Sequence, residues 1–283
     1  MGEPNPPMAR ILMVAPEDDL LRALRASPLL EGREIETASG SLDALRRVSR
    51  RGYDVLLSAP TTSLEEDLAL IELLRSARPG IRLVLLAPRT TPEEVIAALR
   101  SRAFAIFSAP FDAPAIADMV ARALAGEPRE GIEVVSARPD WITVRVNCRL
   151  VDAERLVNFL TELRSDVPDA PRDQLMFAFR EVLLNAMEHG GGFDPDQVVE
   201  VSAIRTRRTL VFYVRDPGQG FDVADVPHAA LANPAHDPLG HAAARAAAGL
   251  RPGGFGLLIA RQVVDEMIHS ERANEVLLIK HLS

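Results

Sequence analysis

Short apolar runs alternate with amphipathic segments through the first 126 residues, and this alternation limits the possible folds most strongly. The apolar runs are Ile11–Val14, Val55–Leu57, Leu83–Ala87 and Ala105–Phe107. The segments with helical spacing between them are Leu20–Ala26, Ser41–Arg50, Leu64–Arg75, Pro92–Arg100 and Ala113–Ala125. Continuously apolar strands are buried on both faces, as in a parallel sheet covered by helices. About five such units predict an α/β doubly wound domain of five parallel strands over residues 8–126.

Composition sets the outer limits on function. The 283 residues suggest two domains, at roughly 100–200 residues each. The net charge of −8 and the lack of a long basic run argue against direct binding to nucleic acid or to an anionic membrane. The single cysteine, Cys148, excludes an internal disulfide framework and fits a reducing compartment. No apolar stretch approaches about 18 residues, and the N-terminal residues lack an apolar signal core, so we expect a cytoplasmic protein.

Nearly all the positive charge is arginine. The only lysine is Lys280, three residues from the end. A phosphate-binding P-loop needs a lysine after its glycine-rich turn, so the chain cannot bind a nucleotide in that way.

The first half resembles the receiver domain of bacterial response regulators, on the order of its elements and on the phrases YDVLLSAP (53–60) and APFD (109–112). Receivers carry an acidic pair, a phosphorylated Asp, a hydroxyl residue and a lysine at fixed strand ends. The matching positions here are, in that order, Ala15 and Pro16, Ala59, Leu86, and Ala109. Magnesium-assisted transfer to a carboxylate needs an acceptor oxygen, metal ligands and a cation. The resemblance therefore implies a degenerate receiver-like domain that is not phosphorylated in the usual way and serves docking, dimerisation or the sensing of another signal.

Three acids lie near the lost acidic pair. Glu17, Asp18 and Asp19 could form a displaced metal site, but we favour acids at a helix N-terminus, where they complement the helix dipole.

The polar stretch from Gly126 to Gly131 marks a linker at residues 127–136, before a second domain at 137–283. The predicted strands of this domain are 142–146, 198–204, 210–214 and 276–281, and the predicted helices are 152–163, 172–189 and 256–267. Hairpin strands with segregated helices predict an α+β sandwich, in which a mixed sheet carries helices on one face.

Three clusters in the second half carry chemistry. In the first, Glu181, Asn185 and His189 are four residues apart on one helix, opposite an apolar stripe of Leu175, Phe179, Val182 or Leu183, and Ala186. A carboxylate and an amide one turn apart can order a water and a divalent cation. Alone, the pair is more often a solvated polar face, and His189 a cation at a helix C-terminus.

The other two clusters are rich in glycine. Asp216–Phe221 (DPGQGF) directly follows a strand, so its backbone can approach a flat ligand while the carboxylate accepts a hydrogen bond from an exocyclic amine. Pro252–Leu257 (PGGFGL) precedes a helix, whose N-terminal N–H groups can bind phosphate. Alone, the first is more often a turn and the second a helix entry. All three clusters in this order are much less expected by chance.

Together the clusters resemble the ATP-binding domain (Bergerat-like) of histidine kinases, gyrase, the Hsp90 chaperone and mismatch-repair proteins, over about residues 137–283. EVLLNAMEHG matches the asparagine motif, DPGQGF the first glycine box and GGFGL the second. The chain is most similar to the anti-sigma-factor serine kinase branch, on NAMEHG, LLIARQVVDEM and NEVLLIKHL.

The resemblance implies a role for each matched residue. It makes Glu181 the general base, Asn185 the magnesium ligand and Asp216 the reader of the adenine amino group. The remaining residues that it implies in the binding of ATP are His189, Gly218, Gly220, Gly254, Gly256 and Leu257.

Three departures from the family pattern bear on turnover more than on binding. Phe255 stands where this branch often has an arginine, and Asn274 replaces a frequent threonine. A long segment, 222–251, separates the two glycine boxes and could supply Arg245 or Arg251 to a phosphate.

The leading hypothesis is an ATP- and Mg²⁺-dependent protein serine/threonine kinase of the partner-switching type. Its partners would be a sigma factor or an anti-anti-sigma antagonist, and relatives of the second domain suggest a homodimer. A non-catalytic ATP-dependent switch is the alternative. An autophosphorylating histidine kinase is disfavoured because all six histidines lie in the second domain, although a kinase module acting in trans stays open. A DNA-binding regulator is disfavoured because no basic recognition helix is present.

Overall fold

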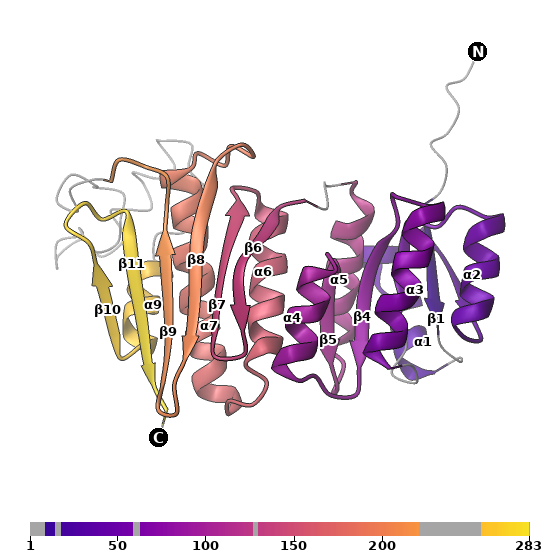
Figure 1. Cartoon of the computed structure of the whole chain (residues 1–283), viewed down its shortest axis with the longest axis horizontal. Coiled ribbons are helices and arrows are strands. Elements are labelled where there is room, and N and C mark those ends of the chain that lie inside the picture. Colours follow the sequence, from indigo (N-terminus) through magenta and orange to yellow (C-terminus); the bar gives the residue numbers. More distant parts are fainter. Residues whose placement is uncertain (1–8, 15–17, 59–62, 127–129, 221–255, 283) are drawn as a thin grey trace, which may run out of the picture. The chain divides into compact units, whose positions relative to one another are not determined.

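The computed structural model describes residues 9–14, 18–58, 63–126, 130–220 and 256–282 (Figure 1). The chain divides into two compact units, Met1–Glu130 and Gly131–Ser283. No helix in the described ranges is both long enough and apolar enough to span a membrane.

The first unit is the predicted doubly wound domain. Its strands are β1 (Arg10–Val14), β2 (Glu34–Ala38), β3 (Val55–Leu57), β4 (Arg82–Ala87) and β5 (Ala105–Ser108). Its helices are α1 (Asp19–Arg25), a 3₁₀ turn (Pro28–Leu30), α2 (Ser41–Arg50), α3 (Leu64–Ala77), α4 (Pro92–Arg100) and α5 (Ala113–Leu124). The strands are parallel in the order β2-β1-β3-β4-β5, which is the flavodoxin-like doubly wound order.

Local sequence explains where these helices begin. Ser63 and Thr91 start α3 and α4 with capping boxes, each closed by a glutamate three residues later. Asp18 accepts a hydrogen bond from the N–H of Leu21 and caps α1. The preferred interpretation of Asp18 and Asp19 as acids at a helix N-terminus is thus confirmed, while Glu17 lies outside the described residues.

The second unit is an α+β domain. Its strands are β6 (Ile132–Arg138), β7 (Trp141–Asn147), β8 (Val198–Arg205), β9 (Thr209–Arg215), β10 (Glu266–His269) and β11 (Glu275–His281). Its helices are α6 (Leu150–Leu163), α7 (Asp169–Asn185), a π-helical turn (Ala186–Gly190) and α9 (Gly256–Val263). The sheet order is β10-β11-β9-β8-β7-β6, and α6, α7 and α9 lie on one face of it (Figure 1).

The pairing within this sheet differs from the prediction. Every neighbouring pair is antiparallel, so the expected mixed sheet is wrong. Two helices, α6 and α7, separate β7 from β8. Because the second helix returns the chain to the end of the sheet where β7 stopped, β8 must run antiparallel to it.

Two further boundaries need correction. Residues 132–136, which we placed in the linker, belong to β6, where a bulge between Val134 and Ser136 breaks the alternation that would have marked a strand. The predicted helix 256–267 ends at Val263, and Glu266–His269 forms β10 instead. There Met267 pairs with Leu278 of β11, so pairing at the sheet edge overrides the local helical pattern.

Candidate nucleotide-binding site

The helix α7 lies against the sheet through its predicted apolar stripe. Leu175, Phe179, Val182, Leu183 and Ala186 are all buried. The Phe179 ring stacks on that of Phe212 in β9, with centroids 4.7 Å apart. This contact fixes which side of α7 faces away from the sheet.

Two of the three predicted polar residues, Glu181 and Asn185, lie on α7 itself. Glu181 and Asn185 are half-buried, one turn apart. At Ala186 the helix widens into a π turn, closed by a hydrogen bond from the N–H of Gly191 to the carbonyl of Ala186. His189 lies within this turn and is exposed, and its part in the site stays a prediction.

Asp216 follows the last residue of β9 and contacts the end of the π turn. A β-carbon on Gly190 would overlap the Asp216 carboxylate, so only glycine permits this approach. The carboxylate accepts a hydrogen bond of 2.8 Å from the N–H of Gly218. Burial raises the pKa of Asp216 above its ordinary value, and the Gly218 bond partly opposes the rise.

The second glycine box contacts α7 at Glu181. A β-carbon on Gly256 would overlap Oε2 of Glu181, so the first residue of α9 lies directly against that carboxylate. The first N–H groups of a helix lack partners within the helix and can bind an anion. Gly256 and Leu257 therefore present the start of α9 near Glu181, whereas Gly254 lies outside the described residues.

An arginine restrains the other oxygen of Glu181. The Arg180 guanidinium lies 3.3 Å from Oε1 of Glu181 and also pairs with Glu154 of α6. These contacts, led by the hydrogen bond to Glu154, raise the pKa of Arg180. The Glu154 and Arg180 pair was not predicted, because nothing in the local pattern relates α6 to α7.

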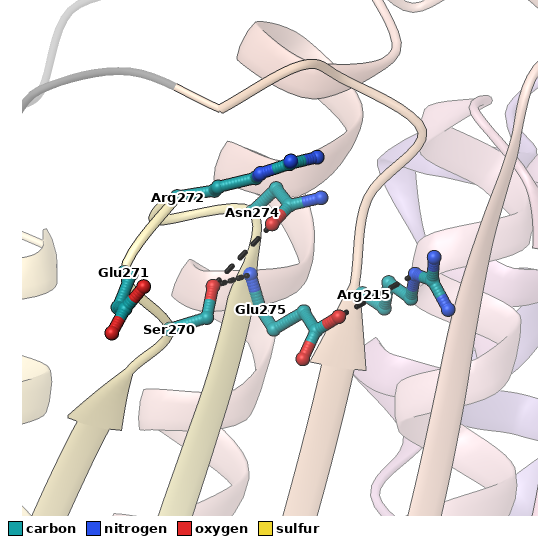
Figure 2. A pocket seen from close by; sticks show the side chains of 6 residues that line it. All are labelled: Arg215, Ser270, Glu271, Arg272, Asn274 and Glu275. Carbon is teal, nitrogen blue, oxygen red and sulfur yellow. Dashed lines mark hydrogen bonds and ion pairs between the residues drawn. The ribbon is translucent and has the colours of Figure 1, made fainter.

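The hairpin between β10 and β11 borders the first glycine box. Gly220 has φ of +80°, and a β-carbon there would overlap the carbonyl oxygen of Arg272. The Asn274 side chain donates a hydrogen bond of 3.4 Å to the Gly218 carbonyl, so this departure from the family pattern contacts the glycine box. A pocket of about 430 Å³ opens beside these residues (Figure 2). It is lined by Arg215, Ser270, Glu271, Arg272, Asn274 and Glu275.

Cys148 lies behind the site. A β-carbon on Gly191 would overlap its Sγ, so the thiol contacts the segment that follows the π turn. Burial, with smaller contributions from Asp194 and Asp216, raises the thiol pKa to about 11. The thiol is thus neutral at pH 7 and packs as an apolar group.

These contacts bring the three predicted clusters together on α7. Its half-buried polar side meets Gly256 at Glu181, and its end meets Asp216 at Gly190. The two contacts are nine residues apart, or roughly 13 Å along the helix axis. Asp216, Gly218 and Gly256 therefore lie along α7 and its π turn, while Gly220 lies against Arg272. The segment 222–251 with Arg245 and Arg251, together with Phe255, lies outside the described residues.

The first-unit positions that match the reactive residues of receivers are apolar where the structure describes them. Leu86 is buried in β4, and Ala109 follows β5. Ala15, Pro16 and Ala59 lie outside the described residues. Within the described ranges, no group of three or more His, Cys, Asp or Glu side chains could hold a metal ion.

Comparison with known proteins agrees with this division. Residues 146–280 match the histidine kinase-like ATPase domain family, and the second unit is a domain of this type. None of the curated proteins compared with the chain matches it.

Solved structures similar to the first unit are response regulators. A CheY-like receiver domain protein from Methanospirillum hungatei JF-1 is 21% identical and covers 42% of this chain and 94% of its own, with a TM-score of 0.37. A response regulator from Thermotoga maritima is 17% identical and covers 42% of this chain and 98% of its own, with a TM-score of 0.38. Chemotaxis protein CheY4 of Vibrio cholerae is 23% identical and covers 41% of this chain and 99% of its own, with a TM-score of 0.35.

Proposed function

We propose that this protein is an ATP-dependent protein serine/threonine kinase of the partner-switching type. The observation that carries the proposal is the double contact of α7, with Asp216 at Gly190 and with the start of α9 at Glu181. A carboxylate at one end and helix N–H groups about 13 Å away fit the adenine and the phosphates of one nucleotide. This arrangement uses no lysine, in agreement with the composition.

The residues present fit a nucleotide with magnesium. Asp216 is half-buried, and no cation pairs with it among the described side chains. Its carboxylate keeps acceptor capacity for an exocyclic amine. Gly218 and Gly220 let the chain after Asp216 pack closely against Gly190 and Arg272, while Gly256 and Leu257 direct N–H groups at phosphate. Bound magnesium would neutralise charge on the phosphates.

Two side chains of α7 serve the transfer itself. Asn185, one turn beyond Glu181, offers an amide oxygen to the metal. Glu181 accepts the proton of the attacking serine or threonine hydroxyl as general base. Arg180 holds Oε1 of Glu181, so that Oε2 faces the start of α9.

The test compares Glu181→Gln with the wild-type protein. We expect phosphoryl transfer from labelled ATP to a co-purified partner to fall at least roughly 100-fold, because the amide cannot accept the proton. Calorimetry should show ATP affinity nearly unchanged. Glu162→Gln on α6 makes the same chemical change away from the site and should transfer normally. Transfer by Glu181→Gln at the full rate would remove Glu181 as the base.

A second candidate function is a non-catalytic ATP-dependent binding switch. The contacts of both Glu181 oxygens, Oε1 with Arg180 and Oε2 with the backbone of Gly256, favour it, because they restrict the approach of a hydroxyl. Stabilisation of the protein by ATP and Mg²⁺ without any phosphorylated product would support the switch. Phosphate on the partner would exclude it.

We propose a cytoplasmic location and protein partners, either a sigma factor or its antagonist. The receiver-like unit would dock such a partner rather than accept phosphate, since Leu86 and Ala109 supply neither a hydroxyl nor a cation. Labelled phosphate on a histidine of the partner, instead of a serine or threonine, would assign the protein to the histidine-kinase type acting in trans.

A further inference from the structure

Arg180 lies beside the part of the site that faces the start of α9. Its Nη1 donates a hydrogen bond of 3.3 Å to Oε1 of Glu181, and Oε2 of the same carboxylate contacts Gly256. One carboxylate group therefore separates the guanidinium from the helix N-terminus that we expect to bind phosphate. The Arg180 side chain is 37% exposed, so a ligand from solution can reach it.

Glu154 of α6 fixes the orientation of the Arg180 guanidinium. Its Oε2 accepts a hydrogen bond of 3.2 Å from Nε, and its Oε1 accepts a second one from Nη2. Two parallel bonds of this kind hold the planar group in one direction. The Glu154 side chain is only 15% exposed, so water competes little for its oxygens.

The guanidinium keeps donors for a second anion. An arginine carries five N–H groups. Two of them bond to Glu154 and one to Glu181, so two stay unused in the described part of the chain, one on Nη1 and one on Nη2. The bond to Glu181 is the longest of the three. The end of the guanidinium that Glu154 leaves open is therefore held least firmly.

The charges in this region explain why a phosphate needs this arginine. Glu154 and Glu181 carry two negative charges, of which Arg180 neutralises one. A triphosphate at the start of α9 meets the remaining charge, and the N–H groups of a single helix end only partly offset the repulsion. The only lysine, Lys280, donates a hydrogen bond of 3.0 Å to the carbonyl of Val263, the last residue of α9, and so lies at the opposite end of that helix.

We propose that Arg180 binds the terminal phosphate of ATP and thereby selects ATP over ADP, while Glu154 positions the guanidinium. The inference rests on the nucleotide site of the proposed function but does not require phosphoryl transfer. A purely structural role, in which the pair only ties α6 to α7, predicts a loss of stability without any change in nucleotide preference.

The test removes Arg180 without changing the local charge. The double variant Arg180→Met, Glu154→Gln deletes one positive and one negative charge, and Glu154 is not left as an unpaired charge. In calorimetry with Mg²⁺, we expect it to bind the β,γ-imido analogue of ATP roughly 10–100-fold more weakly than the wild type, because charged hydrogen bonds to the phosphate are lost. Its affinity for ADP should stay nearly unchanged.

A matched ion pair on the same helix provides the control. Arg172 lies about two turns before Arg180 and pairs with Asp169 at 2.7 Å. The double variant Arg172→Met, Asp169→Asn removes the same charges away from the site and should retain the wild-type preference for the ATP analogue. Arg180→Lys keeps the charge but cannot make two parallel bonds, so it should recover only part of the affinity. Full recovery by lysine would remove Glu154 as a positioning residue.

The outcomes separate this inference from the proposed function. Lost preference in the Arg180 double variant, together with a wild type that yields no phosphoprotein, would support Arg180 and leave the binding switch as the function. Unchanged preference in that variant, or a wild type that binds ADP as tightly as the ATP analogue, would overturn the role of Arg180 and leave the kinase proposal standing. Equal losses in both double variants would also overturn it. A wild type that binds neither nucleotide would overturn both proposals.

Discussion

The two units treat buried polar groups differently. In the described part of the first unit the buried polar side chains are Ser58 and Asp67, and in the second unit they are Asp152, Arg155 and Arg164. The Ser58 hydroxyl accepts a hydrogen bond of 3.0 Å from the N–H of Leu86 and thereby ties β3 to β4. The Ser58 hydroxyl is thus paired within the fold, whereas the buried Nε of Arg75 has no hydrogen-bond partner among the described residues.

The second unit keeps polar groups in places that oppose folding. Burial raises the pKa of Asp216 and of Asp152, which means that the ionised carboxylate is less stable in the folded protein than in water. Asp152 is compensated by two arginines, Arg149 and Arg155. Among the described residues, Asp216 has only the N–H of Gly218 as a partner for its carboxylate. A half-buried carboxylate whose pKa is raised by burial is a candidate for a binding-site residue.

The largest effect on stability should come from removing Asp152, the buried carboxylate that pairs with two arginines. Asp152→Ala leaves Arg155, which is 2% exposed, without the carboxylate that lies 2.9 Å away. We expect the second unit to lose about 3–5 kcal/mol of unfolding free energy, measured by denaturant titration. Asp19→Ala, which removes an exposed ion pair of the first unit, should change stability by less than about 1 kcal/mol. Similar losses for the two variants would show that burial does not distinguish these carboxylates.

Asp216→Asn should affect binding and stability in opposite directions. Loss of the charged acceptor should weaken ATP binding by about 10–100-fold. The neutral amide no longer bears the cost of burying a charge, and its oxygen can still accept from the Gly218 N–H, so the melting temperature should rise by about 2 °C. Calorimetry and thermal unfolding test the two parts separately. Unchanged ATP affinity would place the nucleotide elsewhere, and a lower melting temperature would contradict the assigned cost of burial.

The pH dependence of fold stability and of ATP affinity should follow the titration of Asp216. Because the pKa of Asp216 is raised in the folded protein, its protonation stabilises the fold as the pH falls through that raised pKa, and this stability is lost again as the pH rises. ATP affinity should move the opposite way and fall as the pH decreases through that raised pKa. Asp216→Asn provides the reference for the titration of ATP itself. Identical pH profiles of ATP affinity for the wild-type protein and Asp216→Asn would show that Asp216 does not cause the pH dependence.

The same distinction explains what sequence could predict. The fully buried strands of the first unit were located, because continuous apolar runs mark them, but the edge strand β2 was not. Its sequence, EIETA, mixes polar and apolar residues, since only Ala38 is buried. In the second unit the alternating strands were located, whereas β6 was hidden by its bulge and β10 by a helical pattern.

For the site, sequence predicted the chemical groups but not the contacts between them. The apolar stripe fixed the side of α7 that packs on the sheet, so the half-buried positions of Glu181 and Asn185 followed. The π turn that contains His189 was not predicted. The approach of Gly190 to Asp216, and of Gly256 to Glu181, joins segments far apart in the chain, and spacing alone could not predict it.

The smallest effect should come from removing the Ser58 hydroxyl, which is hydrogen-bonded within the first unit. Ser58→Ala leaves the N–H of Leu86 buried without its side-chain acceptor, which should reduce the stability of the first unit by about 1 kcal/mol. Ser76→Ala, an exposed hydroxyl on α3, should change stability less. Neither substitution should alter ATP affinity, because neither side chain belongs to the site. A weaker affinity in Ser58→Ala alone would show that the strand ends of the receiver-like unit act on the nucleotide site, and the first unit would then be more than a scaffold.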